Sequence, residues 1–334
     1  MPDQLRVYLV AAEPHPRPCP LAVAASAYDE QTEARFDQRY QAYLADDRFR
    51  SVSDPADADF ISNGRDYTLA RVSDEAHRLV NETGKPGIFF DISDNHLPSP
   101  PIDGIVYRHG LLASRALSHE RSWPGLALDL TQAGGGFDPF PHEQRPRVAF
   151  CGLVLPAMQR IWLQVRGKKS TTSQWLRAKV VSAARNATEI DTDFIIRDRY
   201  QGKPVFRDPT LQVRQDFLQN MADSPYALCV RGYGNYSVRF FEAFAAGRVP
   251  VLVDTDCVLP FADEIPYASR CVIVPIDDLA NIGKHIAAFH AKHEQASFAK
   301  LQRANRETWE RWFAPPVMLH RCVERALSEV ACTR

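Results

Sequence analysis

The sequence lacks the features that mark membrane, disulfide-bonded and zinc proteins. No apolar run approaches the roughly eighteen residues that span a bilayer, so we expect no transmembrane segment. The seven cysteines are odd in number and scattered, with no Cys-x-x-Cys pair and no Cys/His pair at zinc spacing. This pattern favours reduced thiols in a cytoplasmic protein over a disulfide framework or a zinc site.

The sequence also lacks a large excess of charge of either sign. The chain has 40 Lys and Arg against 41 Asp and Glu. It therefore has no overall positive electrostatic field to attract a polyanion, which argues against a general nucleic-acid binder. Asp3 stands where a secretory signal would carry positive charge, and four prolines between Pro14 and Pro20 follow. We therefore expect an unsecreted chain in which any anion site is local.

The length of 334 residues exceeds what one hydrophobic core usually supports, so two domains are expected. In both halves, short β-rich apolar runs alternate with amphipathic stretches, which is the pattern of a parallel sheet with crossover helices. The runs expected as strands are Leu5–Ala11, Phe60–Ser62, Gly87–Ile92, Gly104–Tyr107, Arg147–Cys151, Phe194–Ile196, Tyr226–Val230, Val249–Val253 and Cys271–Val274. The fold class is therefore α/β, with two units of similar style in tandem.

A change in composition marks the seam between the two units. Residues 131–146, TQAGGGFDPFPHEQRP, contain three consecutive glycines and three prolines, which suit a linker or hinge. We place the boundary near residue 145, so that the domains cover residues 1–145 and 146–334. An amphipathic helix over Arg306–Val330, broken at Pro315–Pro316, is expected to pack back on the first domain.

The most informative stretch is Tyr226–Asp256, which reads as strand, glycine turn, helix and strand. Asn235 and Ser237 are candidate N-cap residues, and Gly247 suits the left-handed position after the helix. In open α/β sheets, ligands bind at the carboxyl edge, where this helix begins. Its unpaired N–H groups and positive dipole end favour a phosphate.

Three charged side chains strengthen this interpretation. Arg231 in the turn and Arg239 in the first helical turn are placed to reach one anion with charge-assisted hydrogen bonds. Glu242 shares a helical face with Arg239 and can accept from two ribose hydroxyls, so a nucleoside diphosphate fits all three. The alternative is a surface ion pair at i,i+3 spacing, which is common and weak. The nearby Gly152 permits close backbone approach at the edge of a strand, or simply a turn.

The run R-G-x(4)-S-x-R-F-F-E-A-F-A-A-G-R-V-P-V, followed by Leu259-Pro260-Phe261 and the strand Val272–Pro275, resembles the exostosin family of glycosyltransferases. The specific match covers about residues 226–275, and weaker agreement extends over 147–330. The resemblance implies a GT-B fold, in which two Rossmann-like domains face a cleft and the second binds a nucleotide sugar. It places Arg231, Ser237, Arg239 and Glu242 on the donor-site motif. Val230 departs from the family, which often has Pro there, and the membrane anchor of the animal members is absent.

From this resemblance we expect an inverting glycosyltransferase that moves a sugar from a nucleoside-diphosphate sugar to a hydroxyl of a glycan or glycoconjugate. UDP is preferred over GDP, although a fucosyltransferase-like GT-B enzyme that uses a GDP-sugar shares the general E-x(3)-A-G-x-V-P-V pattern. The other alternative is a two-domain protein that binds a nucleotide without turnover. A dinucleotide-dependent oxidoreductase is disfavoured, because no G-x-G-x-x-G follows an expected strand with an acidic residue about twenty positions later.

The catalytic base is expected in the first domain, on the acceptor side. The strand Gly87–Ile92 ends beside Asp91, Asp94 and His96, which could take the proton from an attacking hydroxyl. Asp94 is the first choice, Asp91 the second, and His109 a third on similar grounds. A simple turn before Pro98 explains the same residues equally well.

No metal or other cofactor is expected. The sequence D-x-D, which would suggest a metal-bound diphosphate, occurs at residues 191–193 and 254–256. At this Asp content, one or two copies are expected by chance. His285, His290 and His293 have no carboxylate or Cys to complete a site, and a solvated helix face is expected there. The basic run Arg166–Thr171 lacks the first glycine of a P-loop, which leaves an exposed loop or a minor phosphate contact.

Overall fold

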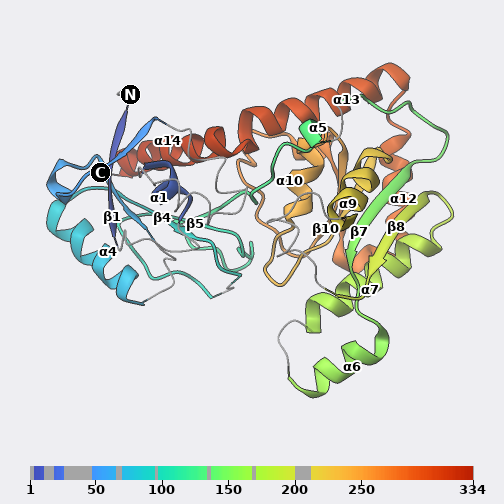
Figure 1. Ribbon diagram of the computed structural model, residues 1–334, viewed down its shortest axis with the longest axis horizontal. Helices are drawn as coiled ribbons and strands as arrows, with labels where there is room; N and C mark the ends of the chain where they lie inside the picture. Colours follow the sequence, from blue (N-terminus) through green and yellow to red (C-terminus); the bar gives the residue numbers. More distant parts are fainter. Residues whose placement is uncertain are drawn as a thin grey trace. The chain divides into compact units, whose positions relative to one another are not determined.

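The computed structural model describes residues 4–10, 19–25, 47–64, 70–94, 97–133, 137–167, 171–199 and 212–333. These form two compact units (Figure 1). The first is built from the described residues up to Leu126, with Val258–Pro260 and the segment from Ala314 onward. The second comprises the described residues of Ala127–Cys257 and Phe261–Phe313.

The first unit contains a parallel sheet with the strand order β2-β1-β3-β4-β5-β6. Its strands are β1 (Leu5–Val10), β2 (Phe49–Ser51), β3 (Phe60–Asn63), β4 (Gly87–Asp91), β5 (Gly104–Arg108) and β6 (Glu120–Ser122). Its helices are α1 (Pro20–Ala25), the 3-10 turn η1 (Pro55–Asp57), α4 (Ala70–Thr83) and α14 (Pro315–Thr333). Every residue of β3 and β4 is buried, as expected for a parallel sheet that is covered on both faces.

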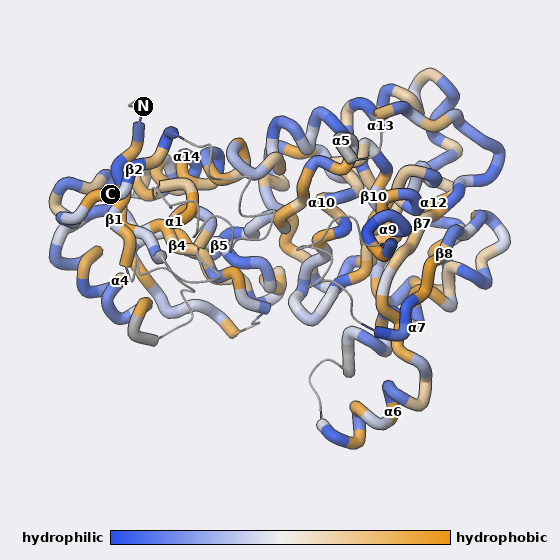
Figure 2. The backbone as a smooth tube through the Cα atoms, viewed as in Figure 1, coloured by the Kyte–Doolittle hydropathy of each residue, from blue (hydrophilic) through white to orange (hydrophobic). Residues whose placement is uncertain are grey.

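The second unit repeats this plan with the strand order β11-β10-β9-β7-β8, again parallel. Its strands are β7 (Arg147–Leu153), β8 (Asp191–Arg197), β9 (Tyr226–Cys229), β10 (Val249–Asp254) and β11 (Val272–Pro275). Its helices are α5 (Leu130–Ala133), α6 (Ala157–Val165), α7 (Thr171–Asn186), α9 (Gln212–Ala222), α10 (Val238–Ala245), α11 (Tyr267–Arg270), η2 (Ile276–Asn281), α12 (Ile282–His290), α13 (Gln295–Thr308) and the π-helix η3 (Trp309–Phe313). Figure 2 shows hydrophobic residues along the strands of each sheet, for example β1 and β8.

Both sheets follow the doubly wound order 2-1-3-4-5, in which the strand order reverses beside the first strand. The α/β fold class and the two Rossmann-like domains, the domain composition of a GT-B protein, are therefore confirmed. The reversal lies between β1 and β3 in the first unit and between β7 and β9 in the second. In such sheets the crevice outside the carboxyl ends at this point is the usual ligand site.

The division between the units falls after Leu126 rather than near residue 145. The segment expected as a linker is held by the second unit: Arg248 donates to the Asp138 carbonyl at 3.1 Å, and the Phe140 N–H donates to Gln302 at 2.8 Å. Gly247 has the expected left-handed φ of 64°, and a Cβ there would collide with the Phe137 ring. These contacts place residues 137–145 on the second core.

The C-terminal helix α14 belongs to the first unit. Its two prolines stand in the first turn, where a missing N–H costs nothing, so they begin a helix instead of interrupting one. The buried Tyr107 hydroxyl of β5 donates to the Cys322 carbonyl at 2.6 Å, and Arg121 pairs with Glu329 at 2.5 Å. Among the residues that the structure describes, no helix is long and apolar enough to cross a bilayer.

Candidate functional site

The candidate site lies at the carboxyl ends of β7 and β9, where the strand order of the second sheet reverses. β9 leads into the loop of Arg231, and α10 begins directly after Ser237. Ser237 occupies the N-cap position with extended backbone, φ −128° and ψ 113°, and its hydroxyl makes no capping hydrogen bond among the described residues. The first N–H groups of α10 therefore face the edge of the sheet at which a ligand is expected.

Arg239 and Gly152, 87 residues apart in the sequence, are brought together here. One Nη of Arg239 donates to the Cys151 carbonyl of β7. The guanidinium carbon lies 5.1 Å from the Phe150 ring centroid and 5.2 Å from that of Phe217, so aromatic faces hold the cation. A Cβ at Gly152 would lie 3.6 Å from Arg239 Nη1 and 3.3 Å from Phe150 Cζ. The tighter of these two contacts is with the Phe150 ring, so a side chain at position 152 would press on that ring, whereas its contact with the guanidinium would be an ordinary van der Waals one.

The loop of Arg231 is fixed in place by Asn235. Arg231 donates to Asn235 Oδ1 at 3.0 Å and to the Tyr233 carbonyl at 2.9 Å. Asn235, 3% exposed, accepts from the Thr255 hydroxyl at 2.7 Å and donates to the Asp256 carbonyl at 3.0 Å. This ties the loop to the end of β10. The sequence indicated Asn235 only as a possible N-cap, and the structure gives it this positioning role.

A third arginine at this edge was missed from the sequence. Arg177 on α7 donates to the Arg231 carbonyl at 3.1 Å and approaches the Leu153 carbonyl at 3.5 Å. Arg177 therefore bridges the ends of β7 and β9. No motif distinguishes Arg177 in the sequence, because it is one basic residue among several on an amphipathic helix. Only its contacts with the Arg231 and Leu153 carbonyls identify it. Guanidinium groups from α7, the loop after β9, and α10 now gather around one strand edge.

Glu242 lies half-buried on α10, one turn after Arg239. Burial lowers the pKa of the Arg214 guanidinium on α9, and the Glu242 carboxylate acts in the opposite direction. Glu242 is thus in the electrostatic reach of a second cation. Its proposed contact with ribose hydroxyls stays a prediction.

A pocket of about 680 Å³ opens beside the arginines, at the carboxyl ends of β7 and β8. It is lined by Val154, Leu155, Pro156, Arg160, Ile195, Ile196, Arg197, Asp198, Val213 and Asp216. Arg197 pairs with Asp216 across it at 3.3 Å. Helix α9 contributes both the pocket residue Asp216 and Phe217, which contacts Arg239, so the pocket adjoins the arginine cluster. Four of the ten lining residues are charged, so the pocket combines an apolar wall with ionic groups.

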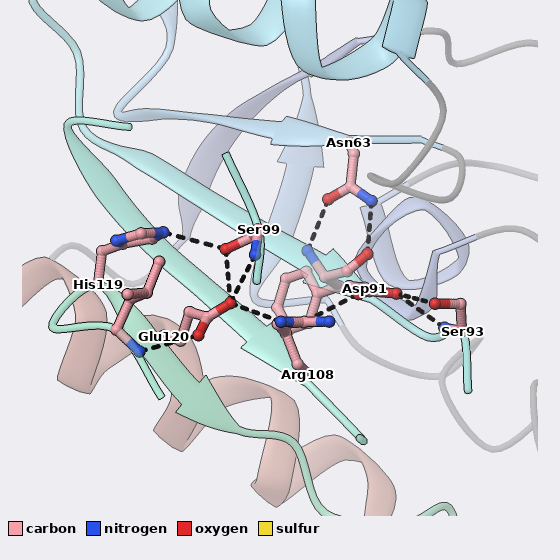
Figure 3. A network of polar contacts seen from close by, with 9 residues as sticks. Asn63, Asp91, Ser93, Ser99, Arg108, His119 and Glu120 are labelled. Atoms are coloured by element: carbon pink, nitrogen blue, oxygen red, sulfur yellow. Dashed lines mark hydrogen bonds and ion pairs between the residues drawn. The ribbon is translucent and has the colours of Figure 1, made fainter. Parts of the chain in front are cut away.

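The first unit contains a buried ionic network, drawn in Figure 3. Arg108 lies between Asp91, at 2.9 Å, and Glu120, at 2.6 Å, and all three side chains are at most 3% exposed. The other Asp91 oxygen accepts from the N–H and hydroxyl of Ser93 at 2.9 and 2.6 Å. Burial raises the pKa of Glu120, but hydrogen bonds from Ser99, Leu117 and Arg108 outweigh it and hold the pKa below its ordinary value.

This network corrects the prediction that Asp91 is a possible base. A general base must reach the acceptor hydroxyl, whereas the Asp91 carboxylate is enclosed and engaged at both oxygens. We assign it a structural role. Asp94 follows β4 at the carboxyl edge and is half-buried, so its role stays a prediction. His96 lies outside the described residues, and His109 is 9% exposed after β5.

Neither D-x-D sequence is arranged as a metal site. Asp191 and Asp193 begin β8, at the amino edge opposite the arginines, and Asp193 accepts from Asn220 at 3.0 Å. Asp254 Oδ1 accepts from the Cys257 N–H at 2.9 Å, which shapes the turn after β10. Within the described residues, no group of three or more His, Cys, Asp or Glu side chains is placed to hold a metal ion.

The histidines of α12 differ from the solvated face that was expected. His290 is 4% exposed, contacts the Tyr226 hydroxyl at 2.9 Å and stacks on His142 at 3.8 Å between ring centroids. His285 pairs with Asp278 at 2.6 Å. His290 is therefore part of the core that holds residues 137–145 on the second unit. The sequence does not reveal this packing, because the partners of His290, Tyr226 and His142, are more than 60 residues away.

Similarity to known proteins points to one family. A family model described as the Exostosin GT47 domain matches residues 106–289. The "Probable glucuronosyltransferase GUT1" of Oryza sativa subsp. japonica is 32% identical over 85 residues, 25% of this chain and 20% of that protein. The "Probable beta-1,4-xylosyltransferase IRX10" of Arabidopsis thaliana is 31% identical over 85 residues, with the same coverage. The chain thus matches about a fifth of the length of these curated relatives.

Among solved structures, the calicheamicin glycosyltransferase CalG4 aligns over 98% of this chain and 99% of its own, with a TM-score of 0.37 and 12% identity. TarM aligns over 72% of this chain and 50% of its own, with a TM-score of 0.37 and 10% identity.

Proposed function

Because the chain belongs to the exostosin GT47 family, we propose that it is a glycosyltransferase that moves a sugar from a nucleoside-diphosphate sugar to a hydroxyl of a glycan or glycoconjugate. The observation that carries the proposal is the convergence of Arg177, Arg231 and Arg239 on the strand edge where the sheet order reverses. Three guanidinium groups beside a helix N-terminus suit a diphosphate.

The proposed reaction requires positive groups that stabilise the negative charge on the leaving nucleoside diphosphate. As the bond between the anomeric carbon and the diphosphate oxygen breaks, its electron pair passes to the nucleoside diphosphate. Arg231 and Arg239, held by Asn235 and the Cys151 carbonyl, are preorganised to stabilise that charge without moving. The acceptor oxygen bonds to the anomeric carbon from the opposite face, which inverts its configuration, and its proton passes to a base, for which we propose Asp94.

We propose UDP as the nucleotide. Relatives that share the matched segment carry the names glucuronosyltransferase and xylosyltransferase, and the pocket beside the arginines offers room for a nucleoside. We also propose a cytoplasmic location, supported by the free thiols of all seven cysteines, each of which lies within the described residues.

A thermal-shift titration tests the nucleotide. A ligand present at 100 times its Kd stabilises the folded state by about 2.7 kcal/mol, so UDP is expected to raise the Tm of the second unit by a few degrees, with GDP and CMP less effective. Release of free UDP from a UDP-sugar only when an acceptor is present then separates a transferase from a protein that binds nucleotides without turnover. A larger shift with GDP would redirect the proposal to a GDP-sugar enzyme.

We expect transfer to be independent of a metal ion, because the arginines supply the positive charge that a cation provides in other transferases. Initial rates measured with excess EDTA are expected to equal those without it, and added Mn²⁺ is expected to leave them unchanged. Loss of activity in EDTA that Mn²⁺ restores would refute this part of the proposal.

A further inference from the structure

Two histidine rings stack where residues 137–145 meet the second unit. The rings of His142 and His290 lie nearly parallel, at an interplanar angle of 7°. His142 belongs to residues 137–145 and is half-buried, whereas His290 ends α12 and is 4% exposed. His142 Nε2 also donates to the His290 carbonyl at 3.1 Å, and both rings meet Phe298 of α13 edge to face. This histidine pair, His142 and His290, is therefore fixed in packed surroundings.

The hydrogen bonds of His290 require a neutral ring. Its Nε2 lies 2.7 Å from the Glu143 carbonyl, which can only accept, so Nε2 carries the proton. Its Nδ1 lies 2.9 Å from the Tyr226 hydroxyl, which then donates to it. A proton on Nδ1 would reverse this bond and leave the hydroxyl hydrogen without an acceptor, in a side chain that is 0% exposed. Such a buried, unsatisfied donor costs stability.

The surroundings of His290 do not compensate a positive charge. Among the described residues, the titratable groups that act on the pair are Glu143 and His142 from residues 137–145, Tyr226 from β9, and Lys292 and His293 after α12. The Glu143 carboxylate is exposed and lies 3.8 Å from Arg147, so it is already shared with a cation. The contacts from α13 come through Gln295 and Phe298, which are uncharged.

Acid therefore weakens this contact. Burial lowers the pKa of His290, the hydrogen bond to the Glu143 carbonyl opposes that effect, and His142 and His293 lower the pKa further. When residues 137–145 separate from the unit, His290 regains water and its pKa returns towards about 6.5. The separated state then binds more protons, so the stabilisation is fully present above about pH 6.5 and is lost as the pH falls from there towards the folded pKa.

We propose that the histidine pair is an acid-sensitive switch, which holds residues 137–145 on the second unit while His290 is neutral and loosens them when it is protonated. These residues also cover the end of α10. The Phe137 ring lies against Gly247, and the Phe140 ring centroid lies 4.6 Å from the Arg248 guanidinium carbon. Loosening them therefore uncovers the end of the helix that carries Arg239. This inference does not rest on the proposed function.

Hydrogen exchange by mass spectrometry on the full chain, at pH 7.5 and 5.0, tests the proposal. After correction for the intrinsic exchange rate at each pH, peptides that cover residues 137–146 are expected to lose protection at least about fivefold at pH 5.0, because a pKa difference of one unit shifts the equilibrium by up to about tenfold. Peptides of β3 and β10 are expected to keep their protection, since the change is local. An equal loss in all of these peptides would indicate general acid unfolding and overturn the proposal.

Three variants assign the effect to the pair. His290→Gln removes the titrating ring and keeps an amide donor for the Glu143 carbonyl, so its protection over residues 137–146 is expected to agree at the two pH values within about twofold. The matched control is His285→Gln on the same helix, which removes a side chain that is 31% exposed and paired with Asp278, and is expected to keep the wild-type loss. If His290→Gln does not fold, the half-buried His142→Gln replaces it and is expected to reduce the loss.

Two results would contradict the switch. One is wild-type protection over residues 137–146 that is the same at pH 5.0 as at pH 7.5. The other is a loss at pH 5.0 that persists undiminished in His290→Gln or, where that variant does not fold, in His142→Gln.

Discussion

Arg239→Ala is expected to lower the affinity for UDP at least about 100-fold, and kcat/KM for the UDP-sugar by at least as much. A guanidinium offers five N–H donors in a rigid fork, and the bond to the Cys151 carbonyl uses one of them. Two charge-assisted hydrogen bonds to a diphosphate, at roughly 1.5–3 kcal/mol each, exceed the 2.7 kcal/mol or so that a 100-fold change requires. Isothermal titration calorimetry measures the loss directly.

Two further variants separate the role of Arg239 in binding from its role in packing. Arg239→Lys keeps the charge but not the paired geometry, so we expect it to retain only part of the affinity. Arg78→Ala removes an exposed arginine of α4 in the first unit, which pairs with Glu82 at 2.6 Å, and is expected to bind UDP like the wild type. Unchanged affinity in a folded Arg239→Ala protein would show that the diphosphate binds elsewhere.

Arg108→Met is expected to destabilise the first unit by about 3–5 kcal/mol, because it leaves the carboxylates of Asp91 and Glu120 buried without their cation. Hydrogen exchange by mass spectrometry locates the effect: peptides of β4 and β5 should lose protection, while those of β9 and β10 keep it. The two units need not unfold together, so a local measurement is more informative than one midpoint.

Two controls accompany the Arg108 variant. The triple variant Arg108→Met/Asp91→Asn/Glu120→Gln removes all three charges and is expected to recover part of the lost protection. Arg6→Ala breaks the more exposed ion pair with Asp59, at 2.8 Å, and is expected to change protection little. If Arg108→Met leaves the β4 and β5 peptides as protected as in the wild type, the network does not stabilise the sheet.

Local pattern predicted much of the second sheet. The runs expected at Tyr226–Val230 and Val249–Val253 became β9 and β10, and the Gly247 turn has the φ that its role requires. These features depend on residues close in sequence. Phe49–Ser51 and Glu120–Ser122 were not recognised as strands, because three residues carry too little periodicity to distinguish a strand from a loop.

The rest of the site depends on contacts that no local pattern encodes. The motif indicated Arg231 and Arg239, but Arg177 joins them from 54 residues away, through a bond to a backbone carbonyl. Asp91 stands at a strand end like a catalytic carboxylate, and only Arg108, 17 residues on, shows it to be part of a buried network. Sequence thus identifies the edge of the sheet and its motif, whereas the partners of each charge follow from the tertiary structure.

The position of α14 in the first unit has a consequence for biosynthesis. Tyr107 and its partner Cys322 are separated by 215 residues of chain. At about 5–20 residues per second, the ribosome adds that length in roughly 10–40 s. During this interval β5 has no helix α14 to cover it, and the Tyr107 hydroxyl has no Cys322 carbonyl. The unit that is translated first is therefore completed only after the second has emerged, and its uncovered sheet is the surface that a chaperone would meet.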